Sequence, residues 1–203
     1  MRNLNSPWMK AAYVAGVTTF CTFLACWAVL AHQENSEKPA HAAVSDTQFA
    51  KKAAQGGMAE VRLGQLAEEK GTSDAVKKFG RRMFEDHTKA GDELKKAAAQ
   101  ENINLPDDIS AKDKATYDAL SKLSGAAFDR AYARDMVKDH EEDIADFNKE
   151  TSGGQKAAIR DFASQTLPTL QDHLKHAKEM RQNVAASNPS STKKNTSGTA
   201  GSK

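Results

Sequence analysis

The chain has 203 residues, of which 39% are hydrophobic and 28% charged, so it can form one folded domain with short appendages. These fractions exclude a wholly disordered chain and a membrane protein with several spans. The formal net charge is +2, and the sequence contains no glycine-rich phosphate loop or dinucleotide fingerprint. Neither a nucleic-acid partner nor a nucleotide cofactor is therefore expected.

Residues 1–31 have the pattern of a segment that directs a chain to the membrane. Residues 11–31 are uncharged, and as a helix of about 31 Å they would match the thickness of a hydrocarbon core. Basic residues precede this stretch, which predicts a cytoplasmic N-terminus, insertion in the inner membrane and export of the rest of the chain. Three alternatives remain open: an uncleaved signal anchor, a signal peptide cleaved near Ala42, and a lipoprotein modified at Cys26. All three predict a domain that faces the periplasm.

The exported part is predicted to be a cysteine-free domain between two polar segments. Both cysteines, Cys21 and Cys26, lie in the apolar stretch, so the rest can form neither a disulfide nor a thiolate metal site. Residues 32–44 are polar and are interpreted as a tether. Residues 187–203 are rich in Ser, Thr, Asn, Lys and Gly and are predicted to be disordered. The folded domain is therefore expected to span residues 45–186.

Apolar residues recur at helical spacing through most of this domain, and two-residue alternation is absent. Capping and stop signals divide it into four long helices, with a short helix over residues 110–124. Pro168 lies inside the last long helix, where it predicts a kink. The boundary signals are a capping box at Ser45, a stop at Gly71, a cap at Thr72 or Ser73, a break at residues 102–106, a cap at Ser110, an interruption at Gly125 and a stop at residues 152–154.

The lengths of the links between the long helices predict the topology. The first and third links are short, which makes antiparallel hairpins, whereas the second link has about 25 residues and can run the length of the bundle. The sequence therefore predicts an all-α chain with a ferritin-like four-helix bundle, whose long helix 2–helix 3 crossover contains the short helix. An up-and-down bundle with the short helix packed on top is the alternative.

Each long helix carries one ionisable residue within its apolar stripe, namely Glu60, His87, His140 and His173. Titratable side chains are rarely buried without partners, so one on each helix is more than scattered surface polarity would give. Imidazole and carboxylate groups suit iron, copper, zinc or manganese, and the four residues form a candidate site for a transition metal ion. An aspartate precedes each histidine and points about 100° away around the helix. We expect these aspartates to lie at the surface or to contact neighbouring helices, rather than to share a metal with the histidine that follows.

Axial positions argue against one tight site. Counted from the turn at Gly71, Glu60 and His87 differ in height by about 8 Å. Counted in the same way from the last hairpin turn, His140 and His173 differ by about 10 Å. This favours a structural interpretation, in which each histidine makes an internal hydrogen bond, over a metal site. Ring nitrogens within about 4 Å of one another would instead favour shared coordination, given metal–nitrogen bonds of about 2 Å.

The chain resembles domain-of-unknown-function family 4142, a family of exported bacterial ferritin-like proteins. The resemblance covers residues 46–180 and implies a ferritin-like bundle in the periplasm or outer envelope. It places Glu60, His87, His140 and His173 at recurrent polar positions of the family, and it implies no settled activity. The segments that carry it are AAQGGMAEVRLGQLA (53–67), FGRRMFEDH (79–87), LSGAAFDRAYARDMVKDH (123–140) and TLPTLQDHLKHA (166–177).

Two functions follow as expectations. The first is an envelope binding or stress-protective protein that holds a metal ion in its core. The second is a structural or protein-interaction module whose core histidines are internal polar pairs. An enzyme is the weakest expectation, because no nucleophile motif is present and the Glu-x-x-His pattern of di-iron ferritins would need Glu where the chain has Phe84, Val137 and Leu170.

Overall fold

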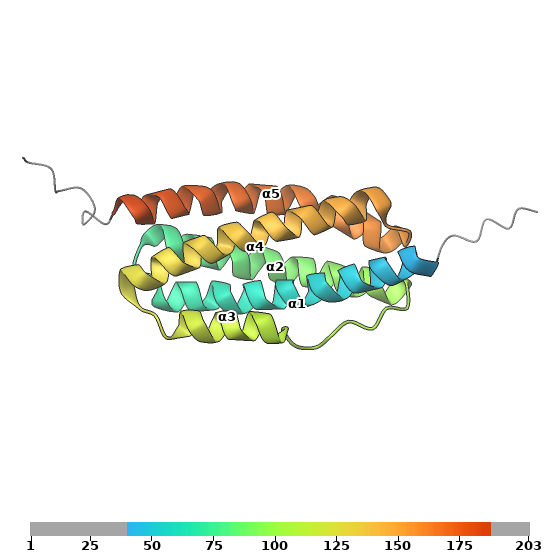
Figure 1. Ribbon diagram of the computed structural model, residues 1–203, viewed down its shortest axis with the longest axis horizontal. Helices are drawn as coiled ribbons and strands as arrows, with labels where there is room; N and C mark the ends of the chain where they lie inside the picture. The colour runs from blue at the N-terminus through green and yellow to red at the C-terminus, as the bar shows by residue number, and fades with distance from the viewer. Residues whose placement is uncertain (1–39, 188–203) are drawn as a thin grey trace, which may run out of the picture. The chain divides into compact units, whose positions relative to one another are not determined.

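The computed structural model describes residues 40–187, which form five α-helices and no strand (Figure 1). The all-α prediction is confirmed. Residues 11–31 and nearly all of the predicted tail lie outside the described residues. Within the described part, no helix combines the length and the apolar character that a membrane span requires. The helices are α1 (Ala40–Lys70), α2 (Asp74–Gln100), α3 (Ala111–Ser121), α4 (Gly125–Gly153) and α5 (Ala157–Ala186).

Local sequence signals account for most of the helix boundaries. Ser73 and Ser110 cap α2 and α3, and each side chain accepts a hydrogen bond from the backbone N–H three residues on. The start of α1 differs from the prediction, because the helix begins at Ala40 rather than at Ser45. Residues 40–44, placed in the tether by the sequence, are therefore helical. Three of these five residues are alanine, the strongest helix former, which extends the helix upstream.

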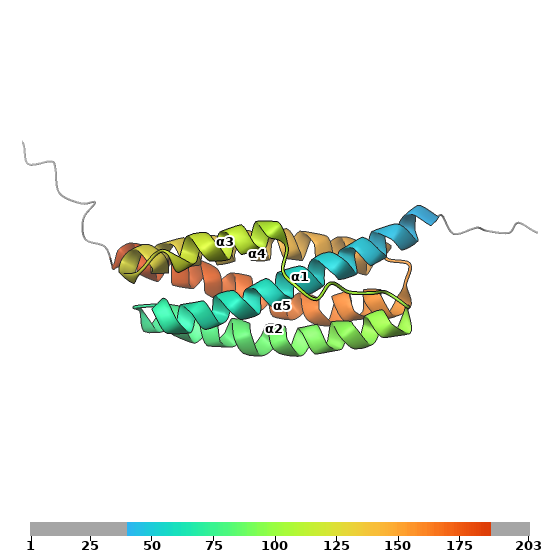
Figure 2. The same cartoon turned by 90° about the horizontal axis from the view of Figure 1, so that it is seen from below.

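The long helices form two antiparallel hairpins, α1 with α2 and α4 with α5 (Figure 1). The chain leaves α2 at one end of the bundle, runs back along it and enters α4 at the opposite end. On the way it forms α3, which packs against α1 and α4 (Figure 2). The long link therefore runs end to end and contains the short helix, as predicted.

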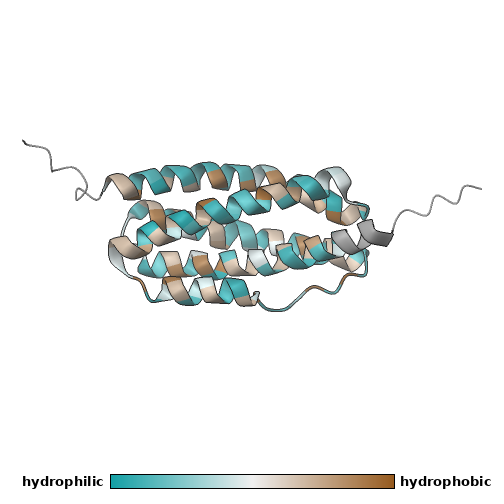
Figure 3. Cartoon of the chain, viewed as in Figure 1, coloured by the Kyte–Doolittle hydropathy of each residue, from teal (hydrophilic) through white to brown (hydrophobic). Residues whose placement is uncertain are grey.

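Two apolar clusters fill the interior. One, which includes Met83 and Tyr132, lies toward the α1–α2 turn, and the other, which includes Leu94 and Phe162, lies toward the α4–α5 turn. Along each long helix, polar and apolar stretches alternate, as amphipathic helices require (Figure 3). The four ionisable residues predicted to face the core fall between the two clusters in each helix. We call Glu60, His87, His140 and His173 the polar layer.

Each hairpin turn is held by a buried aspartate from the other hairpin. Asp129 of α4 accepts hydrogen bonds of 2.6–2.9 Å from the backbone N–H groups of Thr72 and Ser73 and from the Thr72 hydroxyl. Asp46 of α1 accepts hydrogen bonds from the backbone N–H groups of residues 155–156. Both aspartates are at most 3% exposed. Because these bonds join the turn of one hairpin to a helix of the other, they fix the axial register of the bundle.

The backbones of α1 and α2 touch where Gly64 faces Gly80. A Cβ atom at Gly64 would lie 2.5 Å from the Gly80 carbonyl oxygen, and one at Gly80 would lie 2.7 Å from the Gly64 carbonyl oxygen. Neither position can accept a side chain unless the helices separate. A Cβ atom at Gly56, by contrast, would meet no atom within 4 Å. Toward the start of α1 the two helices diverge (Figure 2).

We predict that Gly64→Ala lowers the free energy of unfolding by about 1–3 kcal/mol, because the added methyl group must push two backbones apart. Gly56→Ala is the matched control and should raise it by about 0.5–1 kcal/mol through helix propensity. Urea denaturation of both variants measures the difference. Equal effects at the two positions would contradict the close helix contact.

Candidate metal centre

All four residues of the polar layer point into the interior, as the sequence predicts. Glu60 of α1 and His140 of α4 are 0% exposed, His173 of α5 is 1% exposed and His87 of α2 is 7% exposed. Four long helices thus deliver four titratable side chains to one region of the core. Groups buried this deeply need compensating partners, and those partners decide what the layer can bind.

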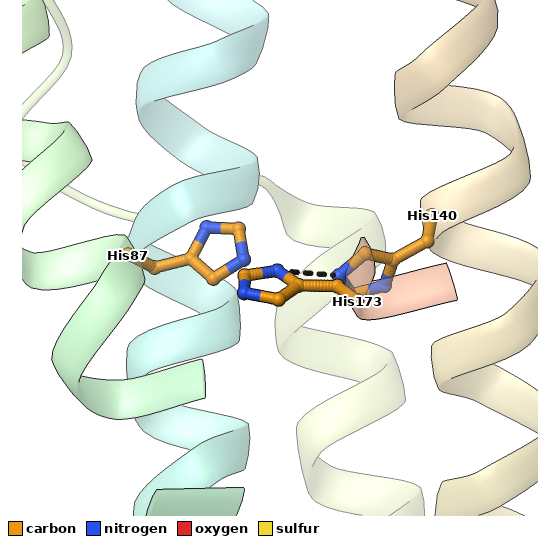
Figure 4. Close-up of side chains that lie close together, drawn as sticks. All are labelled: His87, His140 and His173. Carbon is orange, nitrogen blue, oxygen red and sulfur yellow. Dashed lines mark hydrogen bonds between the residues drawn. The ribbon is translucent and has the colours of Figure 1, made fainter. Parts of the chain in front are cut away.

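The three histidines approach one another from three helices (Figure 4). One nitrogen from each ring can be chosen so that all three lie within 4.8 Å of one another. His140 Nε2 lies 3.3 Å from His173 Nδ1. Glu60 Oε2 lies 2.9 Å from His87 Nε2 and 3.6 Å from His140 Nε2. The carboxylate therefore contacts two of the three rings.

The predicted axial mismatch is wrong, because residues in the turns were counted as helical rise. Helix α1 ends at Lys70 and α2 begins at Asp74, so the turn between them adds no helical rise. In the other hairpin α4 ends at Gly153 and α5 begins at Ala157, and the same holds. Counted from the helix ends instead, the two layer residues of each hairpin differ in height by only about 4.5 Å, which long side chains cover.

The outer nitrogens of two rings have firm partners. His173 Nε2 donates to Asp86 Oδ2 at 2.7 Å, and Arg82 holds the same carboxylate oxygen at 3.2 Å. His140 Nδ1 donates to the carbonyl oxygen of Met136 at 2.9 Å. Asp86 precedes His87 in the sequence but contacts the histidine of another helix, as expected for these aspartates. This signal, an aspartate beside each core histidine, was visible in the sequence, although the pairing was not.

Charge is distributed unequally over the layer. Burial raises the pKa of Glu60, but His140 and His87 lower it further, so this pKa lies well below its usual range. The Glu60 carboxylate raises the pKa of His87 although burial opposes it. Burial lowers the pKa of His140, and together with the neighbouring rings it lowers the pKa of His173 to about 4. At neutral pH the layer therefore contains an ionised Glu60 and two neutral imidazoles, His140 and His173, and Glu60 favours the protonated form of His87.

The two neutral imidazoles face each other with lone pairs. A neutral imidazole has one N–H and one lone pair. The Met136 carbonyl oxygen can only accept a hydrogen bond, so His140 carries its hydrogen on Nδ1. Hydrogen bonds lower the pKa of Asp86 despite its burial, so Asp86 is an ionised acceptor and His173 carries its hydrogen on Nε2. The remaining nitrogens, His140 Nε2 and His173 Nδ1, are then two acceptors only 3.3 Å apart. With these tautomers the contact is repulsive unless a cation, either a proton or a metal ion, lies between the two nitrogens.

Glu60 is incompletely satisfied by its neighbours. Within residues 40–187 neither of its carboxylate oxygens, nor His87 Nε2, makes a hydrogen bond of acceptable alignment, although the two groups approach to 2.9 Å. Asp139 also lies beside the carboxylate and can share a proton with it. A buried carboxylate with few donors remains costly even with the Asp139 proton beside it, and a bound cation would lower that cost.

Three aspartates extend along α4 beside Glu60, and of these the sequence pattern singled out only Asp139, as the residue before His140. Asp135, Asp139 and Asp143 are half-buried and four residues apart, so they share one face of the helix. Burial first and the charge of Glu60 second raise the pKa of Asp135 to about 6, that of Asp139 to about 9 and that of Asp143 to about 7. Their regular spacing could have revealed them in the sequence.

Asp139→Asn should flatten the pH dependence of stability in chelator-treated protein. The raised pKa keeps a proton on Asp139 in the folded state that the unfolded chain loses above about pH 4, so wild-type stability falls as pH rises from about 4 to 9. We expect the variant to match wild type near pH 4 and to exceed it at pH 8 in urea denaturation. Glu141→Gln, at an exposed neighbouring acid, is the control. A wild-type advantage at pH 8 would contradict this account.

Taken together, the fold and the layer define a class of all-α bundle protein with a buried cluster of histidines. Residues 31–180 match the family described as "Domain of unknown function (DUF4142)", and the chain belongs to this family. The resemblance drawn from the sequence is thereby confirmed. No curated protein matches the chain.

The fold is shared with a solved protein of another family. The crystal structure of a DUF305 fragment from Deinococcus radiodurans is similar to this chain with a TM-score of 0.60 and 14% sequence identity. The match covers 68% of this chain and 96% of the fragment. At this identity the likeness concerns the fold alone.

Proposed function

We propose that the bundle binds one transition metal ion in its core, with His87, His140 and His173 as nitrogen ligands and Glu60 as the carboxylate ligand. The observation that carries the proposal is the pair of lone-pair nitrogens 3.3 Å apart on His140 and His173. A shared proton is the other cation that could relieve this contact. It is disfavoured because the pKa of His140 is lowered and that of His173 is lowered to about 4.

The separations suit a single ion. Ligands at about 2.0–2.1 Å from a tetrahedral metal lie about 3.4 Å apart, and three contacts between layer atoms measure 2.9, 3.3 and 3.6 Å. One nitrogen from each of the three rings lies within 4.8 Å of the other two, so the farthest pair must approach slightly for all three to bind one ion. Imidazole favours zinc, copper, iron and nickel over magnesium and calcium. Four protein ligands would close the coordination sphere, as in structural sites. Metal holding therefore suits the layer better than catalysis, and the missing Glu-x-x-His pattern agrees.

The proposal also includes a ferritin-like fold, a periplasmic location and a role in the cell envelope. The two hairpins and the end-to-end crossover support a ferritin-like bundle. The apolar residues 11–31 support insertion in the inner membrane and a domain that faces the periplasm, either anchored or released by cleavage. In that setting a bound metal would serve an envelope protein with a binding or stress-protective role.

Metal analysis of the full-length protein, equilibrated in turn with Zn²⁺, Cu²⁺, Fe²⁺ and Mn²⁺, tests the proposal. We expect one ion per chain for at least one metal, and a loss of affinity of more than about 100-fold in His140→Ala or His173→Ala, since even an outer partner is worth about 10–100-fold. His176→Ala is the matched control, because His176 lies on the same helix one turn beyond His173 and its side chain is 42% exposed.

The alternative is a structural or interaction module in which the layer only fixes helix register. It predicts negligible metal in wild type and a melting temperature that a chelator does not change. Under this alternative, the histidine variants would lower the melting temperature equally with and without chelator. Those results together would overturn metal binding and leave the structural role.

Asp86 should orient His173 for the metal. Asp86→Asn keeps the shape of the side chain but removes the charge that holds the hydrogen on His173 Nε2, and we expect metal affinity to fall about 10–100-fold. Asp172→Asn is the matched control, since Asp172 also binds Arg82, at 2.7 Å, but approaches His176 rather than a ring of the layer. Competition with a chelating dye measures both affinities. Equal losses of metal affinity in the two variants would show that the ion pair with Arg82, rather than the hydrogen bond to His173, controls metal binding.

A further inference from the structure

A cavity of about 310 Å³ opens beside the polar layer, toward the α4–α5 turn. All four long helices line it, and Leu105 and Pro106 of the long link lie at one side. His87 is the member of the polar layer that lines it. Its volume is at the lower end of the range of small-molecule sites.

The cavity exists because the facing surfaces of α1 and α2 lack side-chain bulk at this level. Gly57 of α1 and Gly91 of α2 both line it, and a Cβ atom at either would meet no atom within 4 Å. Alanines at positions 53, 54 and 90 continue the same small-residue walls. The contact between Gly64 and Gly80, farther along the same two helices, is by contrast too tight for any side chain. The space is therefore a local feature rather than loose packing of the whole hairpin.

The other walls are apolar apart from a few polar groups. Leu94, Phe147, Phe162 and Leu170 supply large apolar surfaces. Arg62, Asp92 and Lys95 are charged, and each already has an ion-pair partner: Arg62 pairs with Asp108, and Asp92 pairs with Lys95. These charges are therefore not directed at a ligand.

Three other polar side chains in the cavity, from three helices, are unpaired. Within residues 40–187, neither Asp143 of α4 nor Thr166 of α5 makes a hydrogen bond, and the Nδ1 atom of His87 of α2 makes none either. The outer nitrogens of the other two layer histidines both have partners, Asp86 and the Met136 carbonyl. A histidine that binds a metal through one nitrogen almost always donates from the other. His87 lacks that partner among the described residues, and its free nitrogen belongs to a ring that lines the cavity.

We propose that this cavity binds a small neutral amphiphile with an apolar body of about one ring and a single hydroxyl group. The apolar walls would take the ring, and the hydroxyl would pair with His87, Asp143 and Thr166. A hydroxyl both donates and accepts, so it can pair with an imidazole nitrogen in either protonation state and with a carboxyl group. The site does not require the proposed metal, although His87 joins the two.

Other head groups fit less well. A carboxylate would face Asp143 and the nearby charge of Glu60, and like charges in a buried site repel strongly. An ammonium group only donates hydrogen bonds, so it could not pair with a hydrogen on His87 Nδ1 and would lose its water beside that ring. A nucleotide or sugar would leave most of its polar groups against apolar walls.

Phenol is the probe for a test on chelator-treated full-length protein, so that the result does not depend on metal binding. We expect saturable binding of phenol by isothermal titration calorimetry, and binding of toluene, benzoate and benzylamine at least about tenfold weaker. Thr166→Val, which removes one hydroxyl at constant shape, should weaken phenol binding several-fold. If phenol does not saturate, or if any of the other three compounds binds as tightly, the proposal is overturned.

Two adjacent glycines provide a matched pair of variants. Gly57→Leu places a side chain in the cavity and should weaken phenol binding at least about tenfold. Gly56→Leu adds the same side chain one residue away, at a glycine that does not line the cavity and also has open space, and should leave binding unchanged. Equal binding by the two folded variants, checked by circular dichroism, would contradict the assigned site.

Discussion

Three imidazoles and a carboxylate are buried in one layer between two apolar clusters, and their mutual compensation is the constraint on this core. Each of these groups alone would destabilise the core, because its polar atoms lose water. Together they compensate one another: Glu60 pairs with His87, while Asp86 and a backbone carbonyl satisfy His173 and His140. The compensation is incomplete at the 3.3 Å contact between two lone pairs, and this residual conflict makes the layer a candidate cation site rather than only a structural one.

The register that assembles the layer is set far from it, at the two ends of the bundle. Asp129 and Asp46 each join the turn of one hairpin to a helix of the other through backbone hydrogen bonds. The Gly64–Gly80 contact fixes how closely α1 and α2 approach. A shift of one residue along a helix moves a side chain by about 1.5 Å, which is large compared with the tolerance of a metal–ligand bond. The end contacts are therefore as important to the layer as its own partners.

The predictable features were those set by local sequence. Helical periodicity and the caps at Ser73 and Ser110 predicted the helices. The apolar stripe along each helix predicted the burial of Glu60 and the three histidines. The start of α1 was missed because alanines extend a helix past a capping signal. The relative heights of the four residues along the bundle axis were predicted wrongly, because residues 71–73 and 154–156 form turns that add no helical rise. The four-residue spacing of Asp135, Asp139 and Asp143 is visible in the sequence and indicates one shared helix face.

By itself the sequence determined that this protein is all-helical and which four side chains enter the core, because periodicity and capping act within a few residues. Its family followed from the resemblance of whole sequence segments. Only the tertiary structure decided that these side chains meet in one layer, that Asp86 serves His173 rather than its neighbour His87, and that a cavity opens at Gly57. Those outcomes depend on how two hairpins dock, which is a balance of contacts between residues far apart in the chain, such as Asp46 and Gln155. No local pattern encodes such contacts.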